Sequence, residues 1–345
     1  MKGLLSYTNK GIYCEKADVF IDPWRPVDKA IITHAHADHS RWGMKKYIAH
    51  HHSIPVMKHR LGNDIDVTGK NYGEDFNING VKFSLHPAGH IIGSAQVRVE
   101  YKGEVWVVSG DYKTEADSTC TPFEAVQCHT FITESTFGLP VYDWVPSEEI
   151  YTSINQWWKA NQEEEKVSIL LGYSLGKAQR IIEYLDQNIG NVYTHGAIEN
   201  TNEVLRSAGI SVPTTTRITK ETDKKELIGN MVIAPPSAHN TPWMRKFKPY
   251  SVGITSGWMA LRGARRRRNA DRGFVMSDHA DWKGLNAAVE ATGAENIYVT
   301  HGYSATFAQW LNEKGKNAHV LETEYEGELS EIGESKLNEK EEDQA

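Results

Sequence analysis

Three histidines and an aspartate crowd into six consecutive positions of the stretch "HAHADH", directly after an apolar run typical of a buried strand. These residues are His34, His36, Asp38 and His39. Imidazoles and a carboxylate at this density are costly to bury unless a positive charge organises them. Both are good ligands for Zn²⁺ and related ions, so the alternating spacing predicts a metal site. A polar loop with chance histidines is the alternative interpretation.

Other polar residues stand where further apolar runs end. Strands are expected over 81–86, 95–101, 105–110, 130–133, 273–276 and 297–300, and helices over 147–161, 176–188, 197–209 and 304–315. This alternation predicts an α/β fold. The chemically competent residues just after the strands are His34, His90, Asp111, Glu134, His279 and His301. Strand ends of similar orientation meet at one edge of a sheet, so we expect these side chains to converge.

The ligand inventory suits a two-metal centre, in which about four ligands hold each ion and one carboxylate bridges them. We expect one ion at His34, His36 and His90, the other at Asp38, His39 and His301, and Asp111 between them. Imidazole and oxygen ligands suit Zn²⁺ or Mn²⁺. The "HHH" at 50–52 has no carboxylate nearby and is interpreted as a solvated loop.

Composition narrows the class of protein. The chain has 345 residues and a net charge of −7, which disfavours a general coat for nucleic acid but leaves room for a local basic groove such as 262–268. Its three cysteines form no C-x-x-C pair, which predicts a reducing, cytoplasmic location. No apolar run suits a secretory signal or a membrane span, so we expect no membrane contact.

Several motifs together resemble a known family. "THAHADHS", "AGHIIGSAQ", "SGDYK", "TESTFG", "MSDHADW" and "VTHGY" resemble, in this order, the motifs of metallo-β-lactamase-fold nucleases with an inserted β-CASP domain. The aspartate of the first family motif is matched by Asp22 in "VFIDPW". "FIDPWRPVDKAIITHAHADHSRWG", "YSLGKAQR", "HGAIE" and "SGWMALRGARRRR" resemble the bacterial ligase-associated DNA exonucleases.

The resemblance implies a domain organisation. It predicts an αββα metallo-β-lactamase sandwich over 1–140 and 263–328, with an α/β β-CASP domain inserted at 141–262 as a lid over the metal edge. Residues 329–345 are acidic and lack an apolar face, so we expect a disordered tail.

The resemblance also implies an activity. We expect two divalent metal ions and hydrolysis of phosphodiester bonds, in a DNA 3′-end-trimming exonuclease of DNA repair whose functional partners are a ligase and a helicase. Asp38, Glu134 and His279 are the expected catalytic residues, and Asp22 is expected to orient a ligand imidazole. The expected contacts to nucleic acid are Lys177, Arg180, Arg265, Arg266, Arg267 and Arg268. A solvated surface face is the alternative for these basic residues.

Three other functions stay open. An RNA-processing nuclease of the same family is the nearest, because a histidine at the position of His301 is typical of its RNA-cutting branches. A small-molecule hydrolase such as a thioesterase fits the "HAHADH" motif but not "SDHAD" or the long insertion. A metal-free binding module is disfavoured by the complete ligand set.

Overall fold

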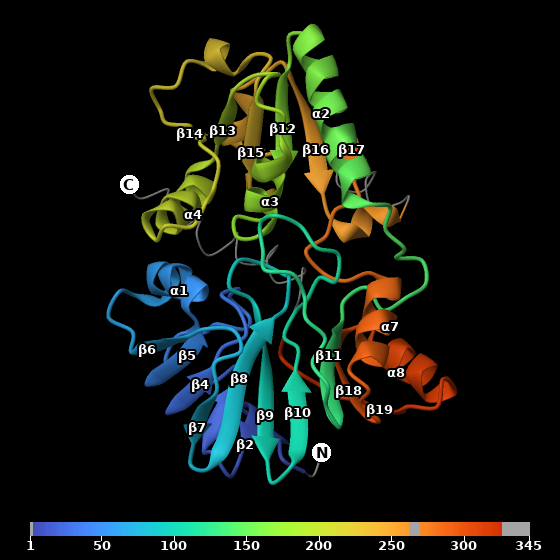
Figure 1. Ribbon diagram of the computed structural model, residues 1–345. Coiled ribbons are helices and arrows are strands. Elements are labelled where there is room, and N and C mark those ends of the chain that lie inside the picture. Colours follow the sequence, from blue (N-terminus) through green and yellow to red (C-terminus); the bar gives the residue numbers. More distant parts are fainter. Residues whose placement is uncertain (1–2, 262–269, 326–345) are drawn as a thin grey trace. The chain divides into compact units, whose positions relative to one another are not determined.

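In the computed structural model the described residues are 3–261 and 270–325, and their strands form three sheets. These residues divide into two compact units. Unit 1 takes the described residues up to Tyr142 and again from Asp278, and unit 2 takes those from Asp143 to Ser277. Figure 1 shows sheets accompanied by helices in each unit, so the expected mixed α/β class is confirmed.

Unit 1 contains two sheets. The first sheet has the order β1 (Ser6–Thr8), β2 (Gly11–Cys14), β3 (Val19–Ile21), β4 (Lys29–Ile31), β5 (Lys46–His50) and β6 (Val67–Lys70). The second has the order β19 (Asn317–Val320), β18 (Asn296–Gly302), β11 (Thr130–Ser135), β10 (Glu104–Val108), β9 (Ala95–Tyr101), β8 (Val81–Pro87) and β7 (Phe76–Ile78). Strands β3 to β6 run parallel, as do β10, β11, β18 and β19.

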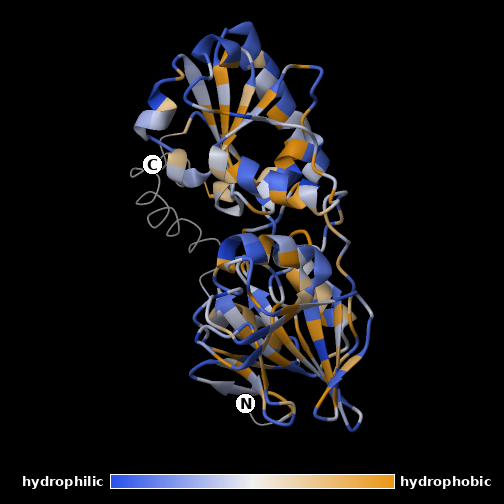
Figure 2. Cartoon of the chain, turned by 90° about the vertical axis from the view of Figure 1, so that its left-hand side faces the viewer, coloured by the Kyte–Doolittle hydropathy of each residue, from blue (hydrophilic) through white to orange (hydrophobic). Residues whose placement is uncertain are grey.

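One hydrophobic core joins the two sheets of unit 1. Ile12, Ile21 and Ile31 of the first sheet belong to the same buried cluster as Phe83 and Val97 of the second. The opposite face of the second sheet packs against α7 (Trp282–Ala291) and α8 (Ser304–Glu313), which lie beside β18 and β19 in Figure 1. Figure 2 shows hydrophilic and hydrophobic bands alternating on the helices, as expected for elements with one buried face.

The helix α1 (Ile54–Leu61) lies beside β5 and β6 and directly follows the short helix η1 (His51–Ser53). It anchors the histidine-rich loop that follows β4, because the Arg60 guanidinium donates hydrogen bonds to the carbonyl oxygens of Ala35 (2.7 Å) and Ser40 (3.5 Å). Helix α1 therefore holds the backbone of the loop that carries His34 and His36.

Unit 2 is built on a parallel sheet. Its order is β14 (Thr216–Arg217), β13 (Val192–Thr194), β15 (Met231–Ala234), β12 (Val167–Leu171), β16 (Tyr250–Thr255) and β17 (Arg272–Phe274). The helices are α2 (Ser147–Glu163), α3 (Lys177–Tyr184), α4 (Gly196–Ser207) and α5 (Pro242–Arg245), with the short helices η2 (Lys224–Leu227), η3 (Pro236–Ala238) and η4 (Gly257–Ala260). β12 is buried along its whole length, as befits the interior of a parallel sheet.

The return from unit 2 to unit 1 differs from the expected position. The sequence suggests that the first domain resumes at 263, yet β17 pairs with β16 through Gly253–Arg272 and Thr255–Phe274, and the compact unit ends at Ser277. Backbone pairing thus keeps the 273–276 strand in the third sheet. Residues 329–345, expected to be a disordered tail, lie outside the described residues.

None of the helices in residues 3–261 and 270–325 combines the length and apolar character that a membrane span requires.

A close approach of two strands makes Gly302, the last residue of β18, a sensitive position. Its φ is +88°, and a Cβ there would overlap the backbone carbonyl of Ser135 in β11. We expect Gly302→Ala to lower the free energy of unfolding, measured by urea denaturation, by about 1–3 kcal/mol more than the left-handed strain alone would. Gly315→Ala is the matched control, because its φ is +86° and a Cβ there would meet nothing within 4 Å. Equal shifts for the two variants would contradict the steric argument.

Candidate metal centre

The chemically competent side chains of unit 1 converge from both of its sheets. His34, His36, Asp38 and His39 stand in the loop between β4 and β5 of the first sheet. From the second sheet come His90 after β8, Asp111 after β10 and His301 in β18. The backbone N–H of Ala95 donates to the carbonyl of Thr33 (2.8 Å), which ties the two sheets together beside His34.

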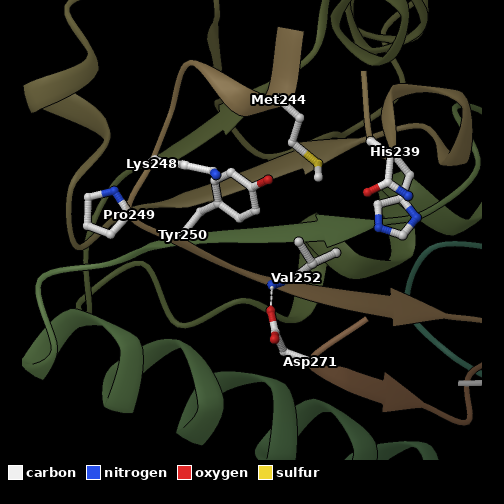
Figure 3. A pocket seen from close by; sticks show the side chains of 8 residues that line it. His239, Met244, Lys248, Pro249, Tyr250, Val252 and Asp271 are labelled. Carbon is white, nitrogen blue, oxygen red and sulfur yellow. Dashed lines mark hydrogen bonds between the residues drawn. The ribbon is translucent and has the colours of Figure 1, made fainter. Parts of the chain in front are cut away.

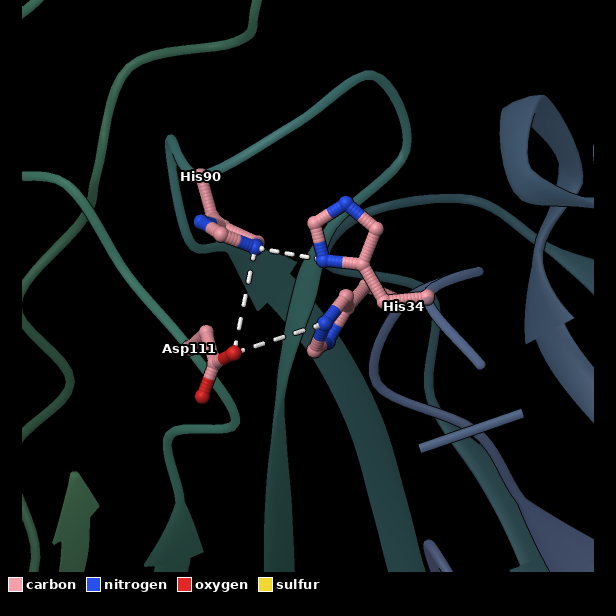
Figure 4. A group of neighbouring side chains, drawn as sticks. His34, His90 and Asp111 are labelled. Atoms are coloured by element: carbon pink, nitrogen blue, oxygen red, sulfur yellow. Dashed lines mark hydrogen bonds and ion pairs between the residues drawn. The ribbon is translucent and has the colours of Figure 1, made fainter. Parts of the chain in front are cut away.

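One group of ligand atoms gathers around a single oxygen of Asp111. The candidate atoms of His34, His36, His90 and Asp111 all lie within 4.8 Å of one another. Asp111 Oδ2 is 3.6 Å from His34 Nε2 and 3.9 Å from His90 Nε2, and His90 Nε2 is 3.1 Å from His36 Nδ1. Figure 4 shows the His34 and His90 rings pointing toward this carboxylate.

The other oxygen of Asp111 faces a second group. Its Oδ1 is 3.1 Å from His301 Nε2 and 3.6 Å from His39 Nε2, and His39 Nε2 is in turn 3.6 Å from Asp38 Oδ2. The two oxygens of one carboxylate therefore address two different sets of imidazoles. This arrangement suits a bridge between two cations.

Hydrogen bonds to two threonines fix which ring nitrogen of His34 and of His301 carries a proton. The Thr33 hydroxyl donates its hydrogen to Asp22, so it can only accept from His34 Nδ1, 3.0 Å away. The Thr300 hydroxyl donates to the carbonyl of Thr133 (3.1 Å) and likewise accepts from His301 Nδ1 (3.2 Å). Both rings then leave the Nε2 lone pair facing Asp111, as a metal ligand must.

Acceptors with no hydrogen of their own fix two further rings in the same way. His39 Nδ1 donates to the Asp22 carboxylate (2.7 Å), and His90 Nδ1 donates to the carbonyl of Asp278 (2.8 Å). The His39 ring also stacks on Tyr325, with centroids 4.3 Å apart. Such partners orient a ligand imidazole and raise its basicity. The expected role of Asp22 is consistent with this contact.

Buried polar atoms at the centre test whether a cation fits it. Among the buried side-chain atoms of residues 3–261 and 270–325 that find no hydrogen-bond partner, four belong to this centre: His34 Nε2, His39 Nε2, His301 Nε2 and Asp111 Oδ1. His34 and Asp111 are at most 2% exposed. Burying such groups unsatisfied costs about 1–3 kcal/mol each, and a bound divalent cation removes that cost. The residues present therefore fit a metal.

Burial and neighbouring charges set the pKa values at the centre. Burial, reinforced by His39, holds the pKa of His34 well below its usual value, so this imidazole is neutral. Burial alone would lower the pKa of His39, but Asp111, Asp38 and Asp22 outweigh it and raise the pKa to about 10. Burial would raise the pKa of Asp111, but His39 and His301 hold it well below the usual range. The pocket thus favours positive charge beside an ionised Asp111.

His279 lies beside this centre, and Glu134 holds its ring. Its Nδ1 is 2.8 Å and 2.9 Å from the two carboxylate oxygens of Glu134, and Glu134 also accepts the backbone N–H of Tyr112 (2.8 Å). The His279 and His90 ring centroids are 4.7 Å apart. A carboxylate bonded to Nδ1 fixes the orientation of the His279 imidazole, a group suited to proton exchange.

Two of these positions differ from the strand-end pattern in the sequence. Glu134 lies within β11 rather than after it, at a register irregularity between Thr133 and Ser135, and His301 lies within β18. Such a bulge re-aims side chains at the end of a strand. His279 follows no strand of unit 1. It is placed instead by the bond from Ala280 N–H to the Tyr112 carbonyl (2.7 Å), just before α7.

The basic residues predicted to contact nucleic acid are outside this cluster. Lys177 and Arg180 stand in the first turn of α3 and are buried, and the Lys177 ammonium lies 4.4 Å from the centre of the Tyr173 ring. Their contact with nucleic acid stays a prediction. Arg265 to Arg268 lie outside the described residues.

A separate cavity of about 540 Å³ in unit 2 is lined by His239, Lys248, Tyr250 and Asp271 among others (Figure 3).

Apart from Asp22, sequence reasoning did not find the residues that support the ligands. Thr33, Thr300, Tyr325 and the Asp278 carbonyl all hold a ligand ring or its partner. One signal was present: a threonine precedes both His34 and His301, in "THAH" and "VTHG". Nothing in the sequence singled out Arg60 or Tyr325.

Comparison with known proteins extends these findings. The chain is 28% identical over 322 residues to a probable DNA ligase from Opitutus terrae, a match that covers 92% of this chain and 31% of that protein. It is 30% identical over 124 residues to endoribonuclease YSH1 from Eremothecium gossypii, covering 34% of this chain and 15% of that protein. An RNase J-like protein from Methanocaldococcus jannaschii is 25% identical over 222 residues, covering 53% of this chain and 51% of that protein. The chain thus spans between 15% and 51% of the length of these relatives.

The fold is also similar to a crystal structure of a protein of unknown function from Enterococcus faecalis V583, with a TM-score of 0.60 and 12% identity over 86% of this chain and 80% of that one. No family model matches the chain. The sequence similarities identify the chain as a relative of the metallo-β-lactamase-fold proteins. Within that class its homologues include β-CASP proteins such as endoribonuclease YSH1 and the RNase J-like protein.

Asp22 offers a test of the hydrogen-bond scheme. We expect Asp22→Asn to weaken metal binding about 10–100-fold, because an amide has only one acceptor oxygen, whereas the carboxylate accepts the Thr33 backbone N–H at Oδ1 and both His39 and the Thr33 hydroxyl at Oδ2. Bound metal is measured by elemental analysis after dialysis against graded free Zn²⁺. Asp22 has a φ of +43°, which asparagine tolerates.

Asp18→Asn is the matched control. Asp18 also has a positive φ, +51°, but it is exposed and bonds only to the Tyr13 hydroxyl among the contacts described for it. A fall in metal affinity of the same size in both variants would show that Asp22 acts through the backbone and not through His39.

Proposed function

We propose that this chain is a dinuclear metal-dependent nuclease that hydrolyses phosphodiester bonds. The observation that carries the proposal is the Asp111 carboxylate, whose two oxygens face two separate groups of imidazoles. The proposal takes unit 1 as the αββα metallo-β-lactamase sandwich and unit 2 as the inserted β-CASP domain. The hydrophobic core shared by the two sheets of unit 1 and the parallel sheet of unit 2 support it.

In this proposal His34, His36, His90 and Asp111 hold one divalent ion, and Asp38, His39, His301 and Asp111 hold the other. Two such ions lower the pKa of bound water and offset the charge that develops on phosphate oxygens. Zn²⁺ and Mn²⁺ both suit these nitrogen and oxygen ligands. Asp22 and the two threonines keep the ligand rings oriented during turnover, so that little reorganisation is needed when charge develops.

Proton transfer is assigned to the pair of Glu134 and His279. Glu134 holds the His279 ring through Nδ1 and stabilises its protonated form, so that Nε2 can donate a proton to the leaving oxygen. His279 lies beside the His90 ring, which places the donor next to the ligands.

DNA is the proposed substrate, and trimming of 3′ ends is the proposed reaction. Support comes from the relative named as a probable DNA ligase, which matches 92% of this chain. A ligase needs a processed terminus, and an end-trimming hydrolase supplies one. A ligase and a helicase are accordingly the proposed functional partners. Lys177 and Arg180 remain proposed contacts to backbone phosphates, at the N-terminus of α3, where the helix dipole favours anions.

An RNA-processing nuclease is the second candidate. The similarity to a protein named endoribonuclease YSH1 favours it, as does His301, which lies 3.1 Å from Asp111. A thioesterase-type hydrolase remains the least favoured, because the relatives named above are nucleic-acid enzymes.

The test compares linear single-stranded DNA with a covalently closed circle of the same sequence, and with the matching RNA, under identical Zn²⁺ or Mn²⁺. We expect the linear DNA labelled at its 5′ end to shorten progressively from the 3′ end while the circle stays intact. Cleavage of the circle at the same rate would exclude obligatory end-trimming. Faster cleavage of RNA would favour the second candidate, and no cleavage of any polymer would overturn the nuclease.

His279→Ala tests the division of roles within the site. We expect the variant to retain its bound metal and to lose about 10²–10⁴-fold in turnover, the usual contribution of a positioned proton donor. Turnover and metal content are measured on the same preparation. His319→Ala is the control, since His319 is exposed on β19. If metal content fell in proportion to turnover, His279 would be a ligand.

A further inference from the structure

A second cluster of imidazoles lies in unit 1 apart from the residues around Asp111. His50 ends β5, and His51 and His52 begin the short helix η1. One candidate ligand atom from each of the three lies within 4.8 Å of the other two. The ring centroids are 4.2 Å apart for His50 and His51, 4.1 Å for His51 and His52, and 5.1 Å for His50 and His52.

His50 is the fixed member of this trio. It is 2% exposed, and its ring stacks on Tyr72 with centroids 3.7 Å apart and an angle of 11°. Its Nδ1 accepts the backbone N–H of His52 over 3.4 Å, so the lone pair of Nδ1 points toward the turn that presents the other two rings. Binding of a cation would replace only this long hydrogen bond.

Two of the three rings, His50 and His52, are held uncharged by their surroundings. Burial, with His51 and His52 adding to it, lowers the pKa of His50 to about 3. Burial followed by the neighbouring His51 also lowers the pKa of His52. Imidazoles close together disfavour the protonation of one another, and neutral imidazoles are good ligands for a metal ion.

The turn that carries the trio is braced on both sides. The Ser53 hydroxyl donates to the carbonyl of Gly93 (2.9 Å), and Gly93 has a φ of +77° with so little space that a Cβ would lie 2.6 Å from the backbone nitrogen of Ser53. His51 and His52 are exposed, which leaves an open side for water or a further ligand. The scaffold is thus rigid at His50 and adaptable at the other two rings.

We propose that His50, His51 and His52 form a further divalent metal site, distinct from the Asp111 centre. Its donors are all imidazole nitrogens. Such a set selects Zn²⁺, Co²⁺, Ni²⁺ or Cu²⁺ over Mg²⁺ and Mn²⁺, which prefer oxygen ligands. The Asp111 centre, with its two carboxylates, lacks that preference, so the two sites differ in the ions they accept.

The test counts bound Co²⁺ and Mn²⁺ by elemental analysis of the full chain after chelation and dialysis, and records the visible spectrum of bound Co²⁺. The variants are the double substitution His51→Ala/His52→Ala and, to keep polarity, His51→Gln/His52→Gln. We expect both to bind one Co²⁺ fewer than the wild type and to lose the matching absorption, with Mn²⁺ binding unchanged. Circular dichroism checks that they fold. His59→Ala, an exposed histidine on α1, is the control and is expected to match the wild type.

Equal Co²⁺ counts in the wild type and both double variants would overturn the proposed site. A parallel loss of Mn²⁺ would also overturn it, because the trio would then act through the Asp111 centre. Neither result bears on nuclease activity, so the proposed function stands or falls on its own experiment.

Discussion

The structure of unit 1 depends on one buried carboxylate that must face two groups of histidines at once. Asp111 can do so only because Gly110 before it has a φ of +58°, and a Cβ there would lie 2.6 Å from the Thr33 hydroxyl. Thr33 precedes His34, so the loop after β10 comes very close to the loop after β4 here. An ionised carboxylate in such a place is tolerated only with matching positive charge and hydrogen bonds. The two sheets must therefore pack so that the loops that carry their ligands meet.

That requirement explains why the supporting hydrogen bonds are as specific as the ligands. Asp22 accepts from the Thr33 backbone (2.7 Å) and from His39 (2.7 Å), so one carboxylate orients ligands on both sides of Asp111. The Tyr325 hydroxyl donates in turn to the Asp22 carbonyl (2.9 Å). These bonds orient the rings of His34, His39, His90 and His301 through Nδ1. Rings held in this way are positioned before any ion arrives, which lowers the reorganisation that binding requires.

The sequence predicted those parts whose signal is local. The alternating residues of 81–86 and 95–101 became β8 and β9, and the amphipathic 147–161 and 304–315 became α2 and α8. Short strands such as β1 and β7 were not predicted, because three residues carry no periodicity. α7 was missed because Gly284 weakens the helix signal, although Asp281 caps it through the Gly284 N–H. For the site, the spacing of histidines and carboxylates in the sequence identified the residues that converge on Asp111. It could not reveal that β17 pairs in the third sheet, since pairing partners are distant in sequence.

The geometry also separates the chemistry from the choice of substrate. Every side chain that converges on Asp111 is a metal-binding or proton-exchanging group, and in the proposed function these act on the phosphodiester that DNA and RNA share. Discrimination between the two polymers requires a contact to the 2′-hydroxyl or to a base, and imidazoles that are bonded through Nδ1 and would hold a metal through Nε2 have no spare atom to make it. A change of substrate class therefore needs no change at His34, His39, His90 or His301. This accounts for relatives named for a DNA ligase and for an endoribonuclease both matching one chain. In the proposed function, the ligand geometry determines the reaction, and other surfaces must determine which polymer is cleaved.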